Sequence, residues 1–106
     1  MNLAVPLVEF QVLPLGTCSP SVSEYVAKAV DVIRKLGFKY RVTPMGTVVK
    51  VSDLTEVGEI MKRISEVMKE SGVQRVVIVV RADVRFDKDL DMDKKVESVM
   101  RRLGER

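Results

Sequence analysis

The stretch VQRVVIVVRADV at residues 73–84 decides the fold class of this chain. At its centre, residues 76–80 are all β-branched and apolar, and the run follows Gly72. Such a run is typical of a strand buried on both faces. A sheet with helices on one side only leaves its other face in water, so this strand indicates that a further layer covers the sheet.

The chain before Gly37 predicts a strand, a loop and a helix. Apolar and polar residues alternate in the second half of residues 3–13, which predicts a strand. Residues 14–20 contain two prolines and a glycine and predict a loop. The helix that follows has two start signals, at Ser19 with a proline after it and at a capping box that begins with Ser21, and it ends at Gly37.

Residues 38–72 predict a hairpin and a second helix. Alternating residues 38–42 and the β-branched stretch 47–51 flank a Thr-Pro-Met-Gly turn at residues 43–46. The helix begins at Ser52 or Asp53, which has a glutamate three residues later, and it ends at Gly72.

These elements follow one another in βαββαβ order. With short connections, this order predicts an α+β, ferredoxin-like sandwich: a four-stranded antiparallel sheet with both helices on one face. The usual strand order, 4-1-3-2, places the strands at residues 3–13 and 47–51 in the middle. An apolar stripe over residues 91–103 predicts an extra C-terminal helix, and we expect one domain over residues 1–106.

The apolar residues on the strands predict contact with another subunit. Val77 and Val79, together with Leu7 and Leu13 of the first strand, lack a covering layer within a two-layer fold. We therefore expect a second subunit to cover the free face of the sheet.

Composition excludes several classes of protein. The chain has 106 residues, of which 46% are apolar and 31% charged, as in one globular domain. No apolar run reaches the length of a membrane span, and residues 1–10 lack the basic start of a signal peptide. A single cysteine excludes a disulfide framework and favours a cytoplasmic location. The many charged residues and few amides favour a heat-adapted source.

The absence of histidine excludes Ser/His/Asp, Cys/His and histidine-based metal chemistry. The net charge of +3 comes from interspersed basic and acidic residues, which argues against nucleic-acid binding, and the third strand lacks the aromatic residues of an RNA-recognition module.

Two stretches resemble metal sites but lack essential ligands. Residues 87–93 carry aspartates at alternate positions, as a calcium loop does, but Met92 stands in place of the glycine and Ser98 in place of the final glutamate. Cys18 has Ser21 where a metal carrier has its second thiol. We expect neither a metal nor a cofactor.

Polar residues of three strands converge in the predicted sheet order. The patch consists of Glu9, Gln11, Thr47, Asp83 and Arg85. Two interpretations stay open: a network between subunits, or a polar small-molecule pocket without a catalytic acid/base pair.

The order of short motifs along the chain resembles the small thiamine-binding, YkoF-like family. The matching elements are Pro14-Leu15-Gly16-Thr17, Ser19-x-Ser21-x-Ser23-x-Tyr25-Val26-Ala27, Gly37-x-Lys39-Tyr40, Pro44-Met45-Gly46-Thr47, Asp83-x-Arg85 and Lys95-Val96-x-Ser98-Val99. The resemblance covers nearly the whole chain. One departure is Lys50, which stands where family members commonly have a glutamate.

The resemblance implies a ferredoxin-like fold, homo-oligomers in which dimers pair into tetramers, and binding of thiamine or its hydroxymethylpyrimidine part without catalysis. The expected ligand-binding residues are Gln11, Thr17, Ser19, Ser21, Ser23, Met45, Thr47, Asp83 and Arg85. Our hypothesis is that Asp83, Thr47 and Ser21 hydrogen-bond the pyrimidine in a pocket closed by a neighbouring subunit, while Phe10, Tyr40 or Met45 lies against the ring.

The leading interpretation is therefore a non-enzymatic, cytoplasmic binding protein that carries, stores or senses its ligand. Two alternatives stay open. One is a structural or regulatory interaction module without a vitamin ligand. The other is an enzyme of thiamine salvage, for which the sequence shows no nucleophile-base pair and no phosphate-binding loop.

Overall fold

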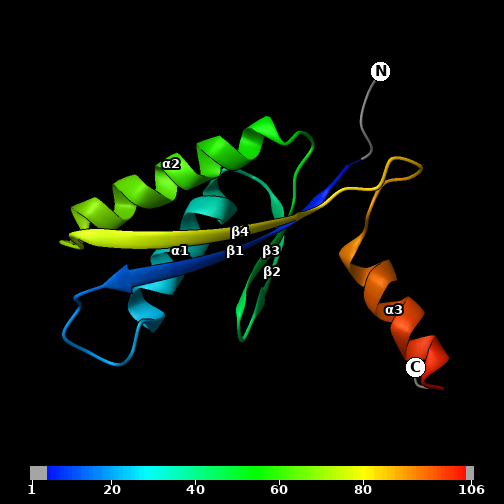
Figure 1. The fold of residues 1–106 in the computed structure, drawn as a ribbon, viewed down its shortest axis with the longest axis horizontal. Helices are drawn as coiled ribbons and strands as arrows, with labels where there is room; N and C mark the ends of the chain where they lie inside the picture. Colours follow the sequence, from blue (N-terminus) through cyan, green and yellow to red (C-terminus); the bar gives the residue numbers. More distant parts are fainter. Residues whose placement is uncertain (1–4, 105–106) are drawn as a thin grey trace.

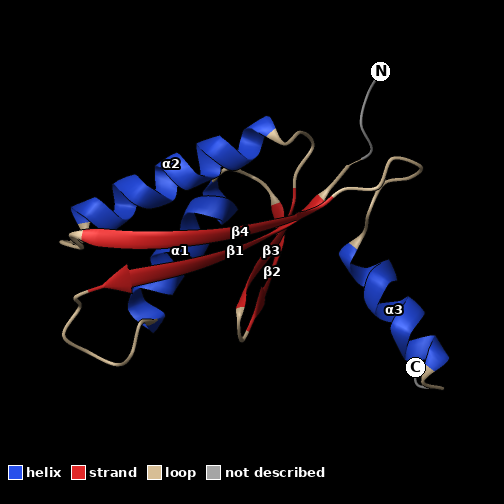
Figure 2. Ribbon diagram, in the orientation of Figure 1, coloured by secondary structure: helices blue, strands red, loops and turns tan. Residues whose placement is uncertain are grey.

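The structure, a computed structural model, describes residues 5–104 and has the predicted ferredoxin-like arrangement. A four-stranded antiparallel sheet has the order β2-β3-β1-β4, with α1 and α2 on one face (Figures 1 and 2). The elements are β1 (Leu7–Leu15), α1 (Ser23–Lys35), β2 (Lys39–Thr43), β3 (Gly46–Lys50), α2 (Thr55–Glu70), β4 (Arg75–Asp83) and α3 (Met92–Arg102). Both the predicted strand order and the extra C-terminal helix are confirmed.

The core lies between the sheet and the pair α1 and α2. Because successive side chains of a strand point to opposite faces, Val8, Phe10 and Val49 all face the helices, and each is at most 2% exposed. Against them pack the apolar stripes of the two helices, whose buried members are Ala29, Val32, Ile33, Ile60, Ile64 and Met68. We call the opposite side of the sheet the outer face.

The predicted capping signal is used at the start of α2 but not at the start of α1. At the start of α2, Glu56 accepts hydrogen bonds from the backbone of Ser52 and Asp53, and Asp53 accepts one from the Thr55 N–H at 2.8 Å. The predicted capping signal there is confirmed. The predicted caps of α1 are wrong, because this helix begins only at Ser23, after a residue that makes no side-chain cap.

Strand β1 runs from Leu7 to Leu15, later along the chain than predicted. Residues 3 and 4 of the predicted strand lie outside the described residues. At its far end β1 continues through Pro14, which pairs with Val76, because β4 is long enough to accompany it. The predicted loop therefore begins two residues later than expected.

Helix α3 touches the outer face only at its beginning. Leu90 and Met92 are buried against Leu7 of β1 and Val48 of β3. The rest of the helix extends away from the sheet (Figure 1). Leu7 is thus covered within its own chain, which corrects the expectation that a second subunit covers it. Leu13, Val77 and Val79 remain 38–45% exposed on the outer face.

Candidate functional site

A cavity of about 250 Å³ lies beside β1, between the tip of the β2–β3 hairpin and α1. Its walls are apolar residues of β1 and α1 together with the hairpin turn. The lining residues are Phe10, Gln11, Val12, Leu13, Val22, Val26, Ala29, Ile33, Thr43, Pro44, Met45, Gly46 and Thr47.

Unequal strand lengths create this cavity. Strand β3 pairs with β1 only as far as Phe10, opposite Thr47, whereas β4 accompanies β1 to Leu15. Beyond Phe10, the edge of β1 that faces the hairpin therefore has no strand neighbour. The space left there is closed by Val22, just before α1, and by Val26 in the first half of that helix.

The hairpin is fixed tightly at the edge of the cavity. The side-chain amide of Gln11 donates a hydrogen bond to the carbonyl oxygen of Met45 at 2.8 Å. The Thr43 hydroxyl donates to the Gly46 carbonyl at 2.8 Å, which closes the turn. Gly46 allows this close approach, since a Cβ atom there would lie 3.0 Å from the carbonyl oxygen of Phe10.

Two polar residues at the cavity keep hydrogen-bonding capacity, Thr47 from the helix side of the sheet and Gln11 from the outer face, at the open edge of β1. Thr47 is 5% exposed, and its hydroxyl makes no hydrogen bond within residues 5–104. Every fully buried side-chain polar atom in that range has a partner, so the Thr47 hydroxyl keeps some exposure through the cavity it lines. Gln11 uses its amide nitrogen on Met45 and leaves its amide oxygen available as an acceptor.

The predicted hydroxyl residues lie in the loop before α1 and, for Ser23, at the first position of that helix. Their hydrogen bonds are local: Thr17 donates to the Ser19 carbonyl, Ser19 accepts from the Ser21 N–H at 3.1 Å, and the Ser21 and Ser23 hydroxyls lie 3.3 Å apart. Val22, between the last two, lines the cavity. None of the four hydroxyl residues lines the cavity itself, and Ser23 lines the neighbouring surface depression between α1 and β2.

Asp83 and Arg85 lie elsewhere, so the predicted single patch does not form within one chain. Asp83 pairs with Leu7, on the outer face, four residues or about 13 Å along β1 from Gln11. It accepts a hydrogen bond from Lys95 at 2.9 Å. Asp83 does not line the cavity, so Asp83 and Thr47 of one chain do not share a ligand.

Arg85 and Glu9 already have partners. Arg85 donates to Asp87 at 2.8 Å, and this hydrogen bond raises the pKa of Arg85 and lowers that of Asp87. Glu9, whose side chain is 18% exposed, accepts two hydrogen bonds from Arg81. Neither residue lines the cavity, and its lining includes no carboxylate.

Lys50, the departure from the family pattern, does not reach the cavity. It lies on the outer face, opposite Leu7 and Lys39. There it lies near Asp91 at the start of α3. The pKa of Asp91 is lowered mainly by the hydrogen bond from the Lys94 backbone, and the positive charge of Lys50 lowers it further. Tyr40 also lies outside the cavity, in a surface depression between β2 and α1.

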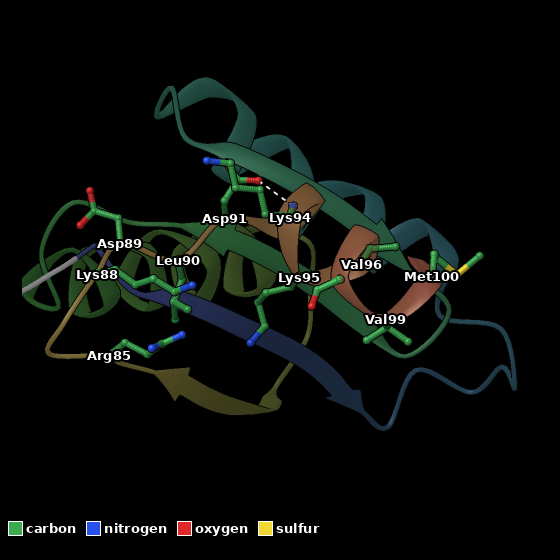
Figure 3. A pocket seen from close by; sticks show the side chains of 11 residues that line it. Arg85, Lys88, Asp89, Leu90, Asp91, Lys94, Lys95, Val96, Val99 and Met100 are labelled. Carbon is green, nitrogen blue, oxygen red and sulfur yellow. Dashed lines mark hydrogen bonds between the residues drawn. The ribbon is translucent and has the colours of Figure 1, made fainter. Parts of the chain in front are cut away.

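A second, wider groove of about 780 Å³ follows α3 (Figure 3). Its lining comes only from α3 and the segment before it: Arg85, Lys88, Asp89, Leu90, Asp91, Lys94, Lys95, Val96, Ser98, Val99 and Met100. Several of its charged groups are already engaged: Lys95 with Asp83, and Asp91 with the first N–H groups of α3. Within residues 5–104, no three side chains of metal-binding type gather around one point.

Sequence reasoning missed the apolar part of the cavity. Val22, Val26 and Leu13 line it, yet Val22 and Val26 belong to a stripe that predicts ordinary helix packing. The signal that identifies the cavity is the difference in length between β1 and β3, which depends on strand ends that a sequence pattern does not fix.

The profile of a family described as "Thiamine-binding protein" matches residues 8–100 of the chain. A "UPF0045 protein" of Methanothermobacter thermautotrophicus is 41% identical over 95 residues, which cover 90% of this chain and 96% of the relative. The "UPF0045 protein YqgV" of Bacillus subtilis is 32% identical over 92% of this chain and 96% of its own length.

Solved structures share the fold. A hypothetical protein of Methanocaldococcus jannaschii, MJ1052, is 33% identical with a TM-score of 0.78, over 92% of this chain and 97% of that chain. A Thermotoga maritima protein that has been assigned provisionally to thiamine biosynthesis or salvage is 25% identical with a TM-score of 0.68, over 90% of this chain and 98% of that chain. Within residues 5–104, no helix has the length and apolar character to cross a bilayer.

Proposed function

Because the chain belongs to the thiamine-binding protein family, we propose that it binds thiamine or its hydroxymethylpyrimidine moiety in the cavity beside β1, without catalysing a reaction. The observation that carries this proposal is the meeting of Gln11, Met45 and Thr47 at one cavity. All three are expected ligand-binding residues, and they come from two separate segments of the chain.

The chemistry of the cavity suits an aminopyrimidine. The ring presents an amine donor beside nitrogen acceptors, which the amide oxygen of Gln11 and the hydroxyl of Thr47 complement. Phe10 and Met45 offer apolar surface to the flat ring. Since no carboxylate lines the cavity, we place the neutral pyrimidine inside and the cationic thiazolium at the mouth.

The remaining expected residues have two different roles in this proposal. Thr17, Ser19, Ser21 and Ser23 bind from the loop at the cavity wall. Asp83 and Arg85 take part only if a neighbouring subunit presents them, because their positions on the same chain are too far from the cavity. We therefore propose a homo-oligomer, in which dimers pair into tetramers, as the binding form.

The absence of catalysis and the cytoplasmic location are part of the same proposal. The cavity contains no carboxylate, amine or thiol side chain that acts as a nucleophile or general base. A binding protein of this kind carries, stores or senses its ligand.

A thermal-shift titration with thiamine, thiamine phosphate and hydroxymethylpyrimidine tests the proposal. A ligand that binds only the native state raises the melting temperature by mass action, so we expect a saturable rise with a compound that contains the pyrimidine. A thiazole alcohol without the pyrimidine is the control and should give no rise. No shift with any of the three compounds at millimolar concentration, with the oligomer intact, would favour an interaction module without a vitamin ligand.

A further inference from the structure

Two apolar surfaces of this chain are uncovered, and they lie at opposite ends of the molecule. The first, the helix stripe, consists of Val96, Val99, Met100 and Leu103 on α3. The second, the sheet patch, consists of Leu13, Leu15, Val77 and Val79 on the outer face. The patch lies at the end of β1 and the start of β4, and Figure 1 shows these strand ends away from α3.

The helix stripe has no support within its own chain. Val96, Val99 and Leu103 are 49%, 57% and 67% exposed, and the helix touches the sheet only near Met92. A helix of 11 residues is marginal in water unless an apolar face is packed. Figure 3 shows Val96, Val99 and Met100 along the side of α3.

The sheet patch is likewise a surface that monomeric proteins rarely leave in water. Its four residues are adjacent, because Leu13 pairs with Val77 and the neighbouring outward positions are Leu15 and Val79. Each is 38–45% exposed. Continuous apolar surface of this kind is typical of an interaction site.

We propose that the helix stripe of one copy packs on the sheet patch of a second copy, and that the second copy returns the same contact. This reciprocal exchange of α3 satisfies twofold symmetry, because the helix stripe of each subunit contacts the sheet patch of the other. The same contact, made twice in the dimer, then buries the helix stripe and the sheet patch of both copies. The self-association proposed above does not specify which surfaces meet.

Size and charge support this pairing. From Val96 to Leu103 the helix rises about 10 Å, and the patch spans about 13 Å between the levels of Gln11 and Leu15. Arg75 at the end of the patch and Glu97 beside the stripe have no ion pair within residues 5–104. Packing the helix on the sheet provides each of these opposite charges with a nearby partner.

The exchange also brings the partner's helix to the mouth of the ligand cavity. Leu13 belongs to the sheet patch and lines the cavity as well. The interface itself does not depend on the identity of the ligand, so its test is independent of ligand binding.

Two single variants and their mixture test the exchange by analytical ultracentrifugation. We expect Val99→Asp and Val79→Lys each to weaken the exchanged dimer by about 100-fold or more, because each symmetric dimer loses two apolar contacts. The matched control is Ser98→Asp, which adds the same charge on the far side of α3 and should leave the oligomer intact.

The decisive sample is the equimolar mixture of the two weakened variants. In a mixed dimer, the carboxylate introduced by Val99→Asp on one chain would meet the ammonium group introduced by Val79→Lys on the other, while the second contact keeps both native valines. The exchange therefore predicts that mixing restores the dimer. Failure of the mixture to associate, or weakening by only one of the two variants, would overturn it in favour of sheet-on-sheet or helix-on-helix pairing.

Folding of each variant is checked by circular dichroism before mixing. If Val79→Lys does not fold, Val77→Lys with Leu103→Asp provides a second pair on the same two surfaces. A wild-type chain that stays monomeric at about 1 mM, where a dimer with a dissociation constant at or below that value would form, also contradicts the proposal.

Discussion

Replacing Thr47 with valine separates the stability of the fold from its affinity for ligand. Thr47 is 5% exposed and lines the cavity, and its hydroxyl has no hydrogen-bond partner within residues 5–104. Valine has nearly the same shape, so the substitution removes a poorly satisfied polar group from a buried position. We expect the free energy of unfolding of the free protein to stay the same or to rise by up to about 1 kcal/mol.

Ligand binding should change in the opposite direction. A pyrimidine that hydrogen-bonds Thr47 would lose that bond and keep a buried polar group without a partner, which costs about 1–2 kcal/mol, or about tenfold in the dissociation constant. Calorimetric titration with hydroxymethylpyrimidine measures the affinity, and urea denaturation measures the stability.

Thr47→Ser serves as the matched control, because it keeps the hydroxyl and removes only a methyl group. It should bind within about threefold of the wild-type protein. An affinity of Thr47→Val equal to that of the wild type, with the cavity intact, would refute the assignment of the hydroxyl to the ligand.

Three further substitutions test neighbouring parts of the account. Gly46→Ala places a Cβ atom 3.0 Å from the Phe10 carbonyl oxygen, so we expect a loss of about 1–3 kcal/mol in urea denaturation and weaker ligand binding. The capping hydrogen bonds at α3 lower the pKa of Asp91 in the folded protein. The ionised carboxylate therefore stabilises the fold above the ordinary carboxyl pKa, and this stabilisation is lost as the pH falls through the pKa of the folded state. Asp91→Asn keeps the cap without the charge, so it should flatten this part of an acid unfolding curve. Lys50→Glu restores the family carboxylate on the outer face, away from the cavity, and a change in affinity of more than about twofold would contradict that placement.

The fold was predictable because its signals are local and repeat along the chain. Alternation in β1, the β-branched run of β4 and Gly72 at the end of α2 each identify an element independently. Once the βαββαβ order is recognised, the sheet order follows from it. Leu7 was misassigned because the residues that cover it, Leu90 and Met92, lie more than 80 positions later in the chain.

The candidate site was predictable only in part. Its members Gln11, Met45 and Thr47 were identified from the pattern of strands and from the family resemblance, and the structure brings these three together. Asp83 was grouped with them because it lies on the neighbouring strand. Its position about 13 Å along β1 from Gln11 separates it from the cavity, and this position depends on the pairing register.

The start of α1 illustrates a limit of capping patterns. Ser21 and Glu24 have the spacing of a capping box, but the Ser21 hydroxyl lies 3.3 Å from that of Ser23 and does not cap the helix. The same residues occur in a loop whose hydroxyl groups hydrogen-bond one another. A capping pattern therefore does not distinguish a cap from a polar loop beside a cavity.

Methyl NMR of the labelled protein, titrated with hydroxymethylpyrimidine, tests the central claim most directly. We predict saturable shifts of the Met45, Val26 and Ile33 methyl signals, which report on the hairpin turn and on the helix wall of the cavity, while the methyl signals of Ile60, a core residue of α2 outside the cavity lining, stay unchanged. Saturable shifts confined to the groove along α3, or no shift at millimolar ligand, would contradict the claim that this cavity is the ligand site.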